Sequence, residues 1–589
     1  MTFPGFGIGS ESGRTLSLPA GPWLYLGLDS LDLERLKRAF PGYRSLQPEL
    51  EREGWKNRRR FLKDKQQGPR LPGNDLAQLV SLQNDQDTVA PGLFLGICKI
   101  RAVRLLLRKV KTIGVISPCA ALTLDLLENL PPGFRKHADP AILKIRFTFE
   151  ILTAALGAFL KMTLGLLYFG YLLLGFRIFG KKRPFCQEGE KWILLQSCLN
   201  PRDVQGTRIH ERYLSKFARN TFADPSRVKR VWVYWFHPPN WRPWKFWRRK
   251  LCPRNYLVLE SLLGWRDFFW AWGVFLRSRR ATHPVVLCGV RVPHLLRLNR
   301  IQGWGNSLLI FHILMYAAIR RLRQNGCSLA RVVTIFENYS AEKPLIAAVR
   351  EFYPDAIIHG YCHSGVQAMN LRYYFASRRP NARFLPDQIH TQGAFFSQRL
   401  ARNGFPAPRL VVSGGYRRTR LRPAPKQGGR GAGPRIGVLL PLEANSAVEL
   451  AAQIKDLANH APARASWWLR FHPMFPEMCR QEIQARLPPG VFWRICDEPA
   501  PTRILRWITH LITNDGSMAL EGIINQKKVL IIKKDLSFQQ TIFDWPEMKN
   551  HVTFYHPQAA DREKKLTSFF RPHPTPLSPQ IIQSLVGSS

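Results

Sequence analysis

The chain has 589 residues, of which 45% are apolar, and its 87 basic and 41 acidic residues give a formal net charge of +46. The apolar content excludes a globally disordered chain, and the length allows more than one hydrophobic core. The charge predicts an anionic partner, such as a nucleic acid, an anionic lipid surface or a phosphate-bearing substrate. Ten cysteines without C-x-x-C pairs or metal-ligand spacing favour reduced, cytosolic thiols.

Residues 1–140 are predicted to be an N-terminal region that is only partly α/β. The run GPWLYLGLD, residues 21–29, is compatible with a first strand. Asp85 and Asp87 have the D-x-D spacing of a metal-binding motif. Two carboxylates in a polar stretch are usually solvated, so we expect no metal site there.

Residues 141–183 are predicted to be a hydrophobic segment associated with a membrane. Its centre, Ile151 to Phe176, is an apolar run of 26 residues whose only charge is Lys161. A run of this length is typical of membrane contact, although a helix buried on all sides of a soluble core is the alternative. Basic residues flank both ends, at 101–111 and 181–183, whereas a single span carries its excess on one side. The flanks therefore favour a re-entrant or in-plane segment, and a span stays open.

The run WRPWKFWRRK, residues 241–250, mixes tryptophan with arginine and lysine. This composition suits a lipid headgroup layer, and it also suits a stacking surface for single-stranded nucleic acid. Because the sequence has no recognisable RNA- or DNA-binding motif, we expect an anionic membrane surface and no nucleic acid. The predicted location is the cytoplasmic face of the inner membrane.

Residues 184–425 are predicted to form a first Rossmann-like domain. Arg331 to Asn338 has the pattern of a strand, residues 341–353 that of an amphipathic helix, and Ala356 to Ser364 that of a second strand. The candidate catalytic residues, near one edge of this sheet, are Glu337, Glu342 and His363. Glu337 is the preferred base. Glu342 in a first helical turn is equally compatible with capping, and His363 with a structural hydrogen bond.

A linker rich in glycine and proline, residues 426–434, is followed by a predicted second Rossmann-like domain at 435–570 and an extended tail at 571–589. Short apolar strands alternate there with helical stretches, as expected when helices cover both faces of a parallel sheet. The predicted strands are Arg435–Pro441, Trp467–Pro473, Val491–Cys496, His510–Asp515, Lys528–Lys533 and His551–His556.

Ligands of such sheets bind at the carboxyl ends of the strands. Arg470, His472 and Pro473 follow the second of these strands. Asn514, Gly516 and Ser517 follow the fourth, where a helix begins. Free N–H groups and the positive end of the helix dipole attract phosphate oxygens, so we expect a diphosphate there, although ordinary N-capping explains the same residues.

Two motifs, LRFHPMFPE and NDGSMALEG, resemble the HP and S-S/T-x-x-x-E pattern of GT-B sugar transferases such as capsule Kdo transferases and bacterial sialyltransferases. The run FENYSAEKPLIAAVREFYPDAIIHGYCHSGV is similar to one in surface carbohydrate biosynthesis proteins. The resemblance covers roughly Val231 to His556. It implies two Rossmann-like domains facing a cleft, a nucleotide-sugar donor without a metal, and a ribose-binding role for Glu521. The family has adjacent hydroxyl residues where this chain has Gly516 and Ser517.

Together these features predict a membrane-associated glycosyltransferase that moves a sugar from a nucleotide sugar to a surface polysaccharide, such as capsule or lipopolysaccharide, or to a lipid-linked glycan. No cofactor beyond this co-substrate is expected. Two alternatives remain. One is a polyol-phosphate transferase that uses a CDP-glycerol type of donor. The other is a non-catalytic assembly protein at the membrane surface, which the missing hydroxyl at Gly516 keeps open.

Overall fold

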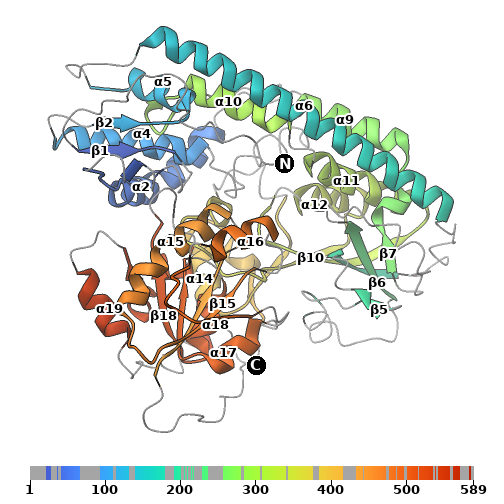
Figure 1. The fold of residues 1–589 in the computed structure, drawn as a ribbon. Helices are drawn as coiled ribbons and strands as arrows, with labels where there is room; N and C mark the ends of the chain where they lie inside the picture. The colour runs from blue at the N-terminus through green and yellow to red at the C-terminus, as the bar shows by residue number, and fades with distance from the viewer. Residues whose placement is uncertain are drawn as a thin grey trace.

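A computed structural model of the chain shows two parallel α/β lobes, joined to an N-terminal region and one long apolar helix (Figure 1). It describes residues 22–27, 33, 36–37, 42–66, 93–110, 114–131, 139–179, 191–199, 204–205, 208–209, 214, 217, 229–236, 256–279, 284–305, 308–339, 342–375, 384–414, 433–441, 444–472, 477–485, 487–496, 501–514, 517–534, 538, 541–556, 561–570 and 583–584. The predicted Asp85–Asp87 loop, the run 241–250 and the linker 426–432 lie outside these residues.

The first lobe is built on a seven-stranded sheet in which every neighbouring pair is parallel. In spatial order its strands are β13 (Leu410–Val412), β12 (Gln388–Thr391), β11 (Ile357–Tyr361), β10 (Ser328–Ile335), β3 (Lys191–Leu199), β6 (Lys229–Phe236) and β7 (Tyr256–Val258). The chain fills the sheet from β3 outward to β7, then returns and fills it from β10 outward to β13. The direction of winding therefore reverses between β3 and β10.

The helices of this lobe include α9 (Trp265–Ser278), α11 (Leu308–Gln324), α12 (Glu342–Phe352) and α14 (Ala394–Arg402). Their buried apolar residues join one large core with the sheet. The strands predicted at 331–338 and 356–364 are confirmed as β10 and β11, which pair in parallel from Arg331 opposite Ile357 to Ile335 opposite Tyr361.

The second lobe is built on a six-stranded parallel sheet. In spatial order its strands are β16 (Trp493–Ile495), β15 (Ser466–Arg470), β14 (Arg435–Leu439), β17 (His510–Thr513), β18 (Lys528–Ile532) and β19 (Thr553–Tyr555). Its helices are α15 (Ala444–His460), α16 (Glu477–Gln484), α17 (Pro501–Trp507), α18 (Ser517–Ile524) and α19 (Arg562–Phe570). All six predicted strands are confirmed. Winding reverses between β14 and β17.

Both faces of this second sheet are buried, as its continuous apolar strands predict. Leu511 and Ile512, successive residues of β17, are fully buried in two different apolar clusters. The prediction of two Rossmann-like parallel-sheet domains is confirmed.

The two lobes touch through the chain that follows β18. The indole Nε1 of Trp545 donates a hydrogen bond to the carbonyl oxygen of Val366, at 2.7 Å. The same segment also contacts the N-terminal region, where Phe538 packs against Phe94 with ring centroids 5.5 Å apart. This segment contains the 3-10 turns η5 (Ile542–Asp544) and η6 (Lys549–His551). The second lobe therefore contacts the loop that follows β11.

The N-terminal region adds a small parallel sheet of β1 (Trp23–Tyr25) and β2 (Gly114–Ile116), with α2 (Gln47–Gln66), α4 (Leu93–Leu107) and α5 (Ala120–Glu128). The strand predicted within 21–29 is thus confirmed, but it pairs with β2 and not with either large sheet. The described residues also contain two short antiparallel pairs, namely β4 (Val204–Gln205) with β5 (Arg208–Ile209), and β8 (Val286–Leu287) with β9 (Val290–Arg291).

The predicted hydrophobic segment is a single helix, α6 (Pro140–Phe179), which runs along one side of the molecule beside α10 (Pro293–Trp304) (Figure 1). Over Pro140–Tyr171 it is long and apolar enough to cross a membrane by length and composition, and its most apolar window is only 17% buried. The alternative of a helix buried on all sides is therefore wrong.

The expectation of reduced thiols holds for part of the described chain. Cys98, Cys119, Cys288, Cys362 and Cys496 are free. Cys327 is disulfide-bonded, so the expectation is wrong for that residue.

Candidate functional site

In the first lobe, a carboxylate and an imidazole meet at the carboxyl end of the sheet. Glu337 follows β10 and His363 follows β11, and these two strands are neighbours. A carboxylate oxygen of Glu337 lies 3.0 Å from Nδ1 of His363, with the Glu337 side chain 3% exposed and the His363 side chain 16% exposed. Because β10 also borders the point where winding reverses, the pair sits where ligands bind in open α/β sheets.

Arg372 completes this cluster from the 3-10 turn η3 (Leu371–Tyr373). Its guanidinium lies 3.5 Å from the second carboxylate oxygen of Glu337, and it also stacks 4.1 Å from the ring centroid of Tyr339. Burial alone would raise the pKa of the Glu337 carboxyl, but the close contact with His363 and the charge of Arg372 lower that pKa to about 2. Glu337 is therefore a carboxylate at any physiological pH.

Glu342 points into the backbone of the preceding loop. Its carboxylate accepts hydrogen bonds from the N–H of Glu337 at 2.8 Å and of Tyr339 at 3.1 Å. Burial raises the pKa of the Glu342 carboxyl. Between these two donors, Asn338 has a φ of +61°, in the left-handed region that asparagine tolerates, and its amide donates to the Arg372 carbonyl at 2.6 Å. Glu342 thus holds the loop that presents Glu337.

The structure therefore brings Glu337 and His363 into contact and places Glu342 behind them. A buried carboxylate against Nδ1 orients the imidazole, and Nε2 is the ring nitrogen on the side away from this contact. Sequence reasoning missed Arg372. It lies in a short turn just after the run that ends at Val366, and no periodic pattern marks it.

In the second lobe, three of the predicted residues gather near the reversal of winding between β14 and β17. Arg470 ends β15, His472 follows it, and Glu521 lies one turn into α18. Burial lowers the pKa of the Arg470 guanidinium, while Cys496 and Glu521 favour its charged form. Burial and the nearby charge of Arg470 lower the pKa of the His472 imidazole. The Arg470 guanidinium therefore lies close to both the His472 imidazole and the Glu521 carboxyl of α18.

Asn514 has a structural partner. Its side-chain amide donates to the carbonyl of Ser446 at 2.6 Å, and both residues are buried. This bond ties the end of β17 to the first turn of α15. Ser517 begins α18, but its side chain lies outside the described part, as do Pro473 and Gly516.

The second cluster has the chemistry of an anion site. Arg470 supplies positive charge, and α18 begins after β17, beside the point where the winding reverses between β14 and β17. Free N–H groups at a helix N-terminus and a guanidinium both bind phosphate oxygens. Among the described residues, no group of three or more His, Cys, Asp or Glu side chains is placed to hold a metal ion.

The sequence matches no family model and no curated protein. Among solved structures, it is similar to a UDP-GlcNAc 2-epimerase from Neisseria meningitidis bound to UDP-GlcNAc, with a TM-score of 0.37 and 11% identity over 64% of this chain and 90% of that one. It is also similar to the lipopolysaccharide outer core galactosyltransferase WaaB, with a TM-score of 0.37 and 12% identity over 67% and 94%. CalG4, the calicheamicin glycosyltransferase, gives 0.33 and 10% over 65% and 94%.

The strand orders of the two sheets define a two-lobed α/β protein in which each lobe has a doubly wound parallel sheet. Each lobe carries a cluster of charged side chains at the carboxyl edge, next to the point where its winding reverses.

Proposed function

We propose that the protein is a glycosyltransferase that moves a sugar from a nucleotide-sugar donor to a hydroxyl of a glycan acceptor. The observation that carries this proposal is the buried Glu337–His363 pair at the winding reversal of the first lobe. A base oriented in this way suits removal of a proton from a hydroxyl. In the second lobe, Arg470, His472 and the beginning of α18 suit a phosphate leaving group. The first lobe would therefore activate the acceptor, and the second would hold the donor.

In the proposed step, Nε2 of His363 takes the proton of the acceptor hydroxyl while the oxygen attacks the anomeric carbon of the donor. The bond between that carbon and the phosphate oxygen breaks, and its electron pair leaves with the nucleotide. Glu337 stays ionised and stabilises the imidazolium that forms. A base within hydrogen-bond reach contributes roughly a hundredfold or more to such a rate.

This assignment moves the base from the carboxylate preferred on sequence grounds to the histidine. Because the pKa of Glu337 is lowered to about 2, its carboxylate is a weak base at neutral pH. Its position against His363 and Arg372 suits an orienting group.

The leaving diphosphate is assigned to the beginning of α18 with Arg470 and His472. A preorganised guanidinium and helix N–H groups stabilise the charge that develops on the leaving oxygen, and this stabilisation needs no metal. Glu521 beside Arg470 is assigned to the nucleoside, as the resemblance to GT-B transferases implies. Surface polysaccharides and lipid-linked glycans are the proposed acceptors.

Calorimetric titration of the purified protein with UDP, CDP, CMP and GDP tests the donor half. We expect one nucleotide to bind and Arg470→Gln to weaken its binding at least tenfold. Arg494→Gln is the matched control, since Arg494 is an exposed arginine on the neighbouring strand β16 and should leave binding unchanged. Turnover of CDP-glycerol would favour the polyol-phosphate transferase, and no nucleotide binding would favour the assembly protein.

A further inference from the structure

The helix α6 presents a continuous row of large apolar side chains to the outside. Apart from one adjacent pair, they recur every three or four residues along the helix, and each is more than one third exposed: Ile142, Ile145, Phe149, Leu152, Leu156, Phe159, Leu160, Leu164, Leu167, Tyr171 and Leu174. With 40 residues, α6 is about 60 Å long. Isolated exposed apolar residues are normal on a protein surface, but a contiguous row of this length indicates an interaction surface.

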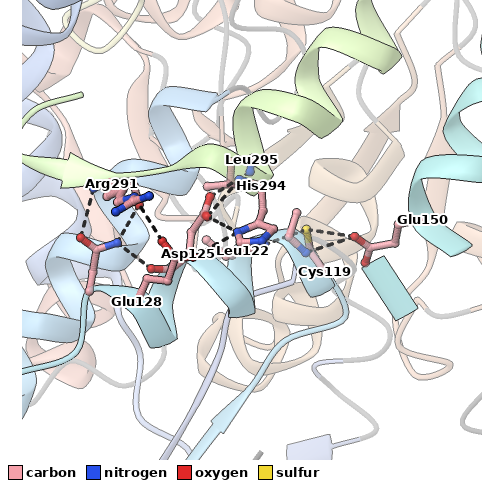
Figure 2. Close-up of polar contacts among 10 residues, drawn as sticks. Cys119, Leu122, Asp125, Glu128, Glu150, Arg291, His294 and Leu295 are labelled. Atoms are coloured by element: carbon pink, nitrogen blue, oxygen red, sulfur yellow. Dashed lines mark hydrogen bonds and ion pairs between the residues drawn. The ribbon is translucent and has the colours of Figure 1, made fainter. Parts of the chain in front are cut away.

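The opposite face of α6 is fixed to the body of the protein near its N-terminal end. Glu150, in the first third of the helix, caps α5: its carboxylate accepts hydrogen bonds from the N–H of Ala120 and Ala121 (Figure 2). Asp125 of α5 in turn accepts hydrogen bonds from the N–H of His294 and Leu295, at the start of α10. These carboxylates join α5, α6 and α10 into one unit.

The same face is also packed farther along. A Cβ added at Gly305, just beyond α10, would lie 2.9 Å from Cα of Ala158, so only glycine permits this close approach of the two backbones. Phe169 stacks on Phe268 of α9, with ring centroids 4.5 Å apart. From Glu150 to Phe169, therefore, α6 lies flat against the protein.

This packing argues against a membrane span. A span would carry the helices attached to α6 into the hydrocarbon layer. One of them, α10, has Arg297 and Arg300 exposed, and burying such charges in lipid is costly. An in-plane helix instead needs an apolar outer face and a protein-bound inner face, and α6 has both.

Side chains beside the apolar row match a lipid headgroup layer. Lys144, Arg146 and Lys161 on α6 are exposed, as is Arg266 on α9, where it adjoins the exposed rings of Trp265 and Phe269. Lysine and arginine attract anionic headgroups, and tryptophan favours the boundary between headgroups and hydrocarbon.

The polar groups within the row need no water. Thr148, Thr153 and Thr163 each donate their hydroxyl to the carbonyl of the residue four positions earlier, at 2.9, 2.9 and 3.0 Å. Such internal bonds satisfy hydroxyls that enter an apolar phase. The net charge of +46 also disfavours a second copy of this chain as the occupant, because two such surfaces would repel each other.

We propose that the exposed face of α6 is an in-plane docking surface for an anionic lipid bilayer. The helix lies parallel to the membrane, its apolar row enters the outer part of the hydrocarbon layer, and the flanking cations contact headgroup phosphates. This proposal is independent of the transfer reaction proposed above.

Flotation of the full-length protein with vesicles of phosphatidylcholine containing 0 or about 30% phosphatidylglycerol tests the surface. We expect binding that requires phosphatidylglycerol and that weakens at least tenfold in the triple variant Ile145→Glu/Leu152→Glu/Leu167→Glu. These positions are 61–70% exposed, so the variant should keep the wild-type melting temperature. Phe492→Glu is the matched control, because Phe492 is a 79% exposed apolar residue of the second lobe. Equal binding of the triple variant and the wild type would overturn the proposal.

The orientation needs a second measurement. A spin label, introduced as an unnatural amino acid at position 145, 152, 160 or 167, reports its depth in the bilayer through its accessibility to oxygen and to a water-soluble nickel complex. An in-plane helix predicts the same depth at all four positions. A depth that changes steadily along the series would show a span, and water accessibility at all four would show no insertion; either result would overturn the proposal. Self-association of the wild type without lipid, lost in the triple variant, would assign the row to a second copy instead.

Discussion

The carboxylate of Glu337 lies 3.0 Å from Nδ1 of His363, and both residues directly follow neighbouring strands of one parallel sheet. Two features hold this relationship in place. Glu342 binds the N–H groups of the loop that carries Glu337, and Arg372 contacts the second carboxylate oxygen. A base that is oriented in advance loses little entropy on reaching the transition state, which is why the pair matters for catalysis.

Glu337→Gln tests whether the carboxylate orients and stabilises the imidazole. The neutral amide keeps the size of the side chain but not its charge, so we expect kcat to fall roughly a hundredfold or more with KM nearly unchanged. Steady-state kinetics under saturating donor separates the two constants. A variant that loses only affinity would show that Glu337 binds substrate instead.

Glu342→Gln and Glu342→Ala test the supporting role of Glu342. The amide keeps one acceptor oxygen for the loop, whereas alanine leaves two buried N–H groups without it. We expect alanine to cost about 1–3 kcal/mol in the free energy of unfolding and the amide to cost less. Urea denaturation measures both. If the two variants matched the wild type in stability but lost all activity, Glu342 would belong to the chemistry.

Acid should destabilise the first lobe through His359 and His390. These buried rings lie 3.1 Å apart, His359 Nδ1 to His390 Nε2. Burial lowers both pKa values from 6.5 to about 4, and the charge of Arg331 adds to this effect on His359, as the charge of His359 does on His390. At pH values between about 4 and 6.5, these two histidines bind protons in the unfolded chain but not in the folded chain. Stability therefore falls as the pH falls from about 6.5 to about 4, and it falls no further from this cause below about 4.

The loss of folding stability between pH 6.5 and 4 is on the order of 3 kcal/mol for each of the two histidine rings, from the usual conversion of a pKa difference to free energy. Urea denaturation at several pH values between 7.5 and 4 measures the slope, and His390→Asn should flatten it. An unchanged slope in that variant would assign the acid sensitivity to other groups.

Asn514→Ala distinguishes a structural from a binding role at the end of β17. The Asn514 amide holds the carbonyl of Ser446, so its loss should cost about 1–3 kcal/mol in stability. We expect nucleotide affinity to fall only modestly, because the contact to α15 positions the edge of the sheet without reaching the ligand. A large loss of nucleotide affinity at unchanged stability would instead make Asn514 a direct ligand contact.

The second lobe was readable from the sequence because its strands are buried on both faces. Strands such as HLIT in β17 therefore consist almost entirely of apolar residues. The predicted boundaries enclose five of the six observed strands, and β15 begins one residue before its predicted start at Trp467. In the first lobe, the sequence predicted only the strands β10 and β11. Its strands β3 and β6 precede β10 by a long stretch of chain and join the sheet through pairing that no local pattern reveals.

Local sequence patterns also identified Glu337 and His363, but they did not identify the contacts that form between separate helices and strands. The apolar length of α6 was evident, yet which face is covered depends on Glu150, Gly305 and Phe268, residues whose roles arise only from packing. Arg372 was missed for the same reason, since its contact with Glu337 is tertiary.

A transfer assay with His363→Asn tests the central claim most directly. Wild type and variant are incubated with a panel of radiolabelled nucleotide sugars and a membrane-lipid extract as acceptor, and nucleotide affinity is measured in parallel by calorimetry. We predict that the wild type transfers one sugar, and that His363→Asn binds the same nucleotide equally well while transfer falls roughly a hundredfold or more. Undiminished transfer by His363→Asn, or a wild type that binds no nucleotide and transfers no sugar, would contradict the account.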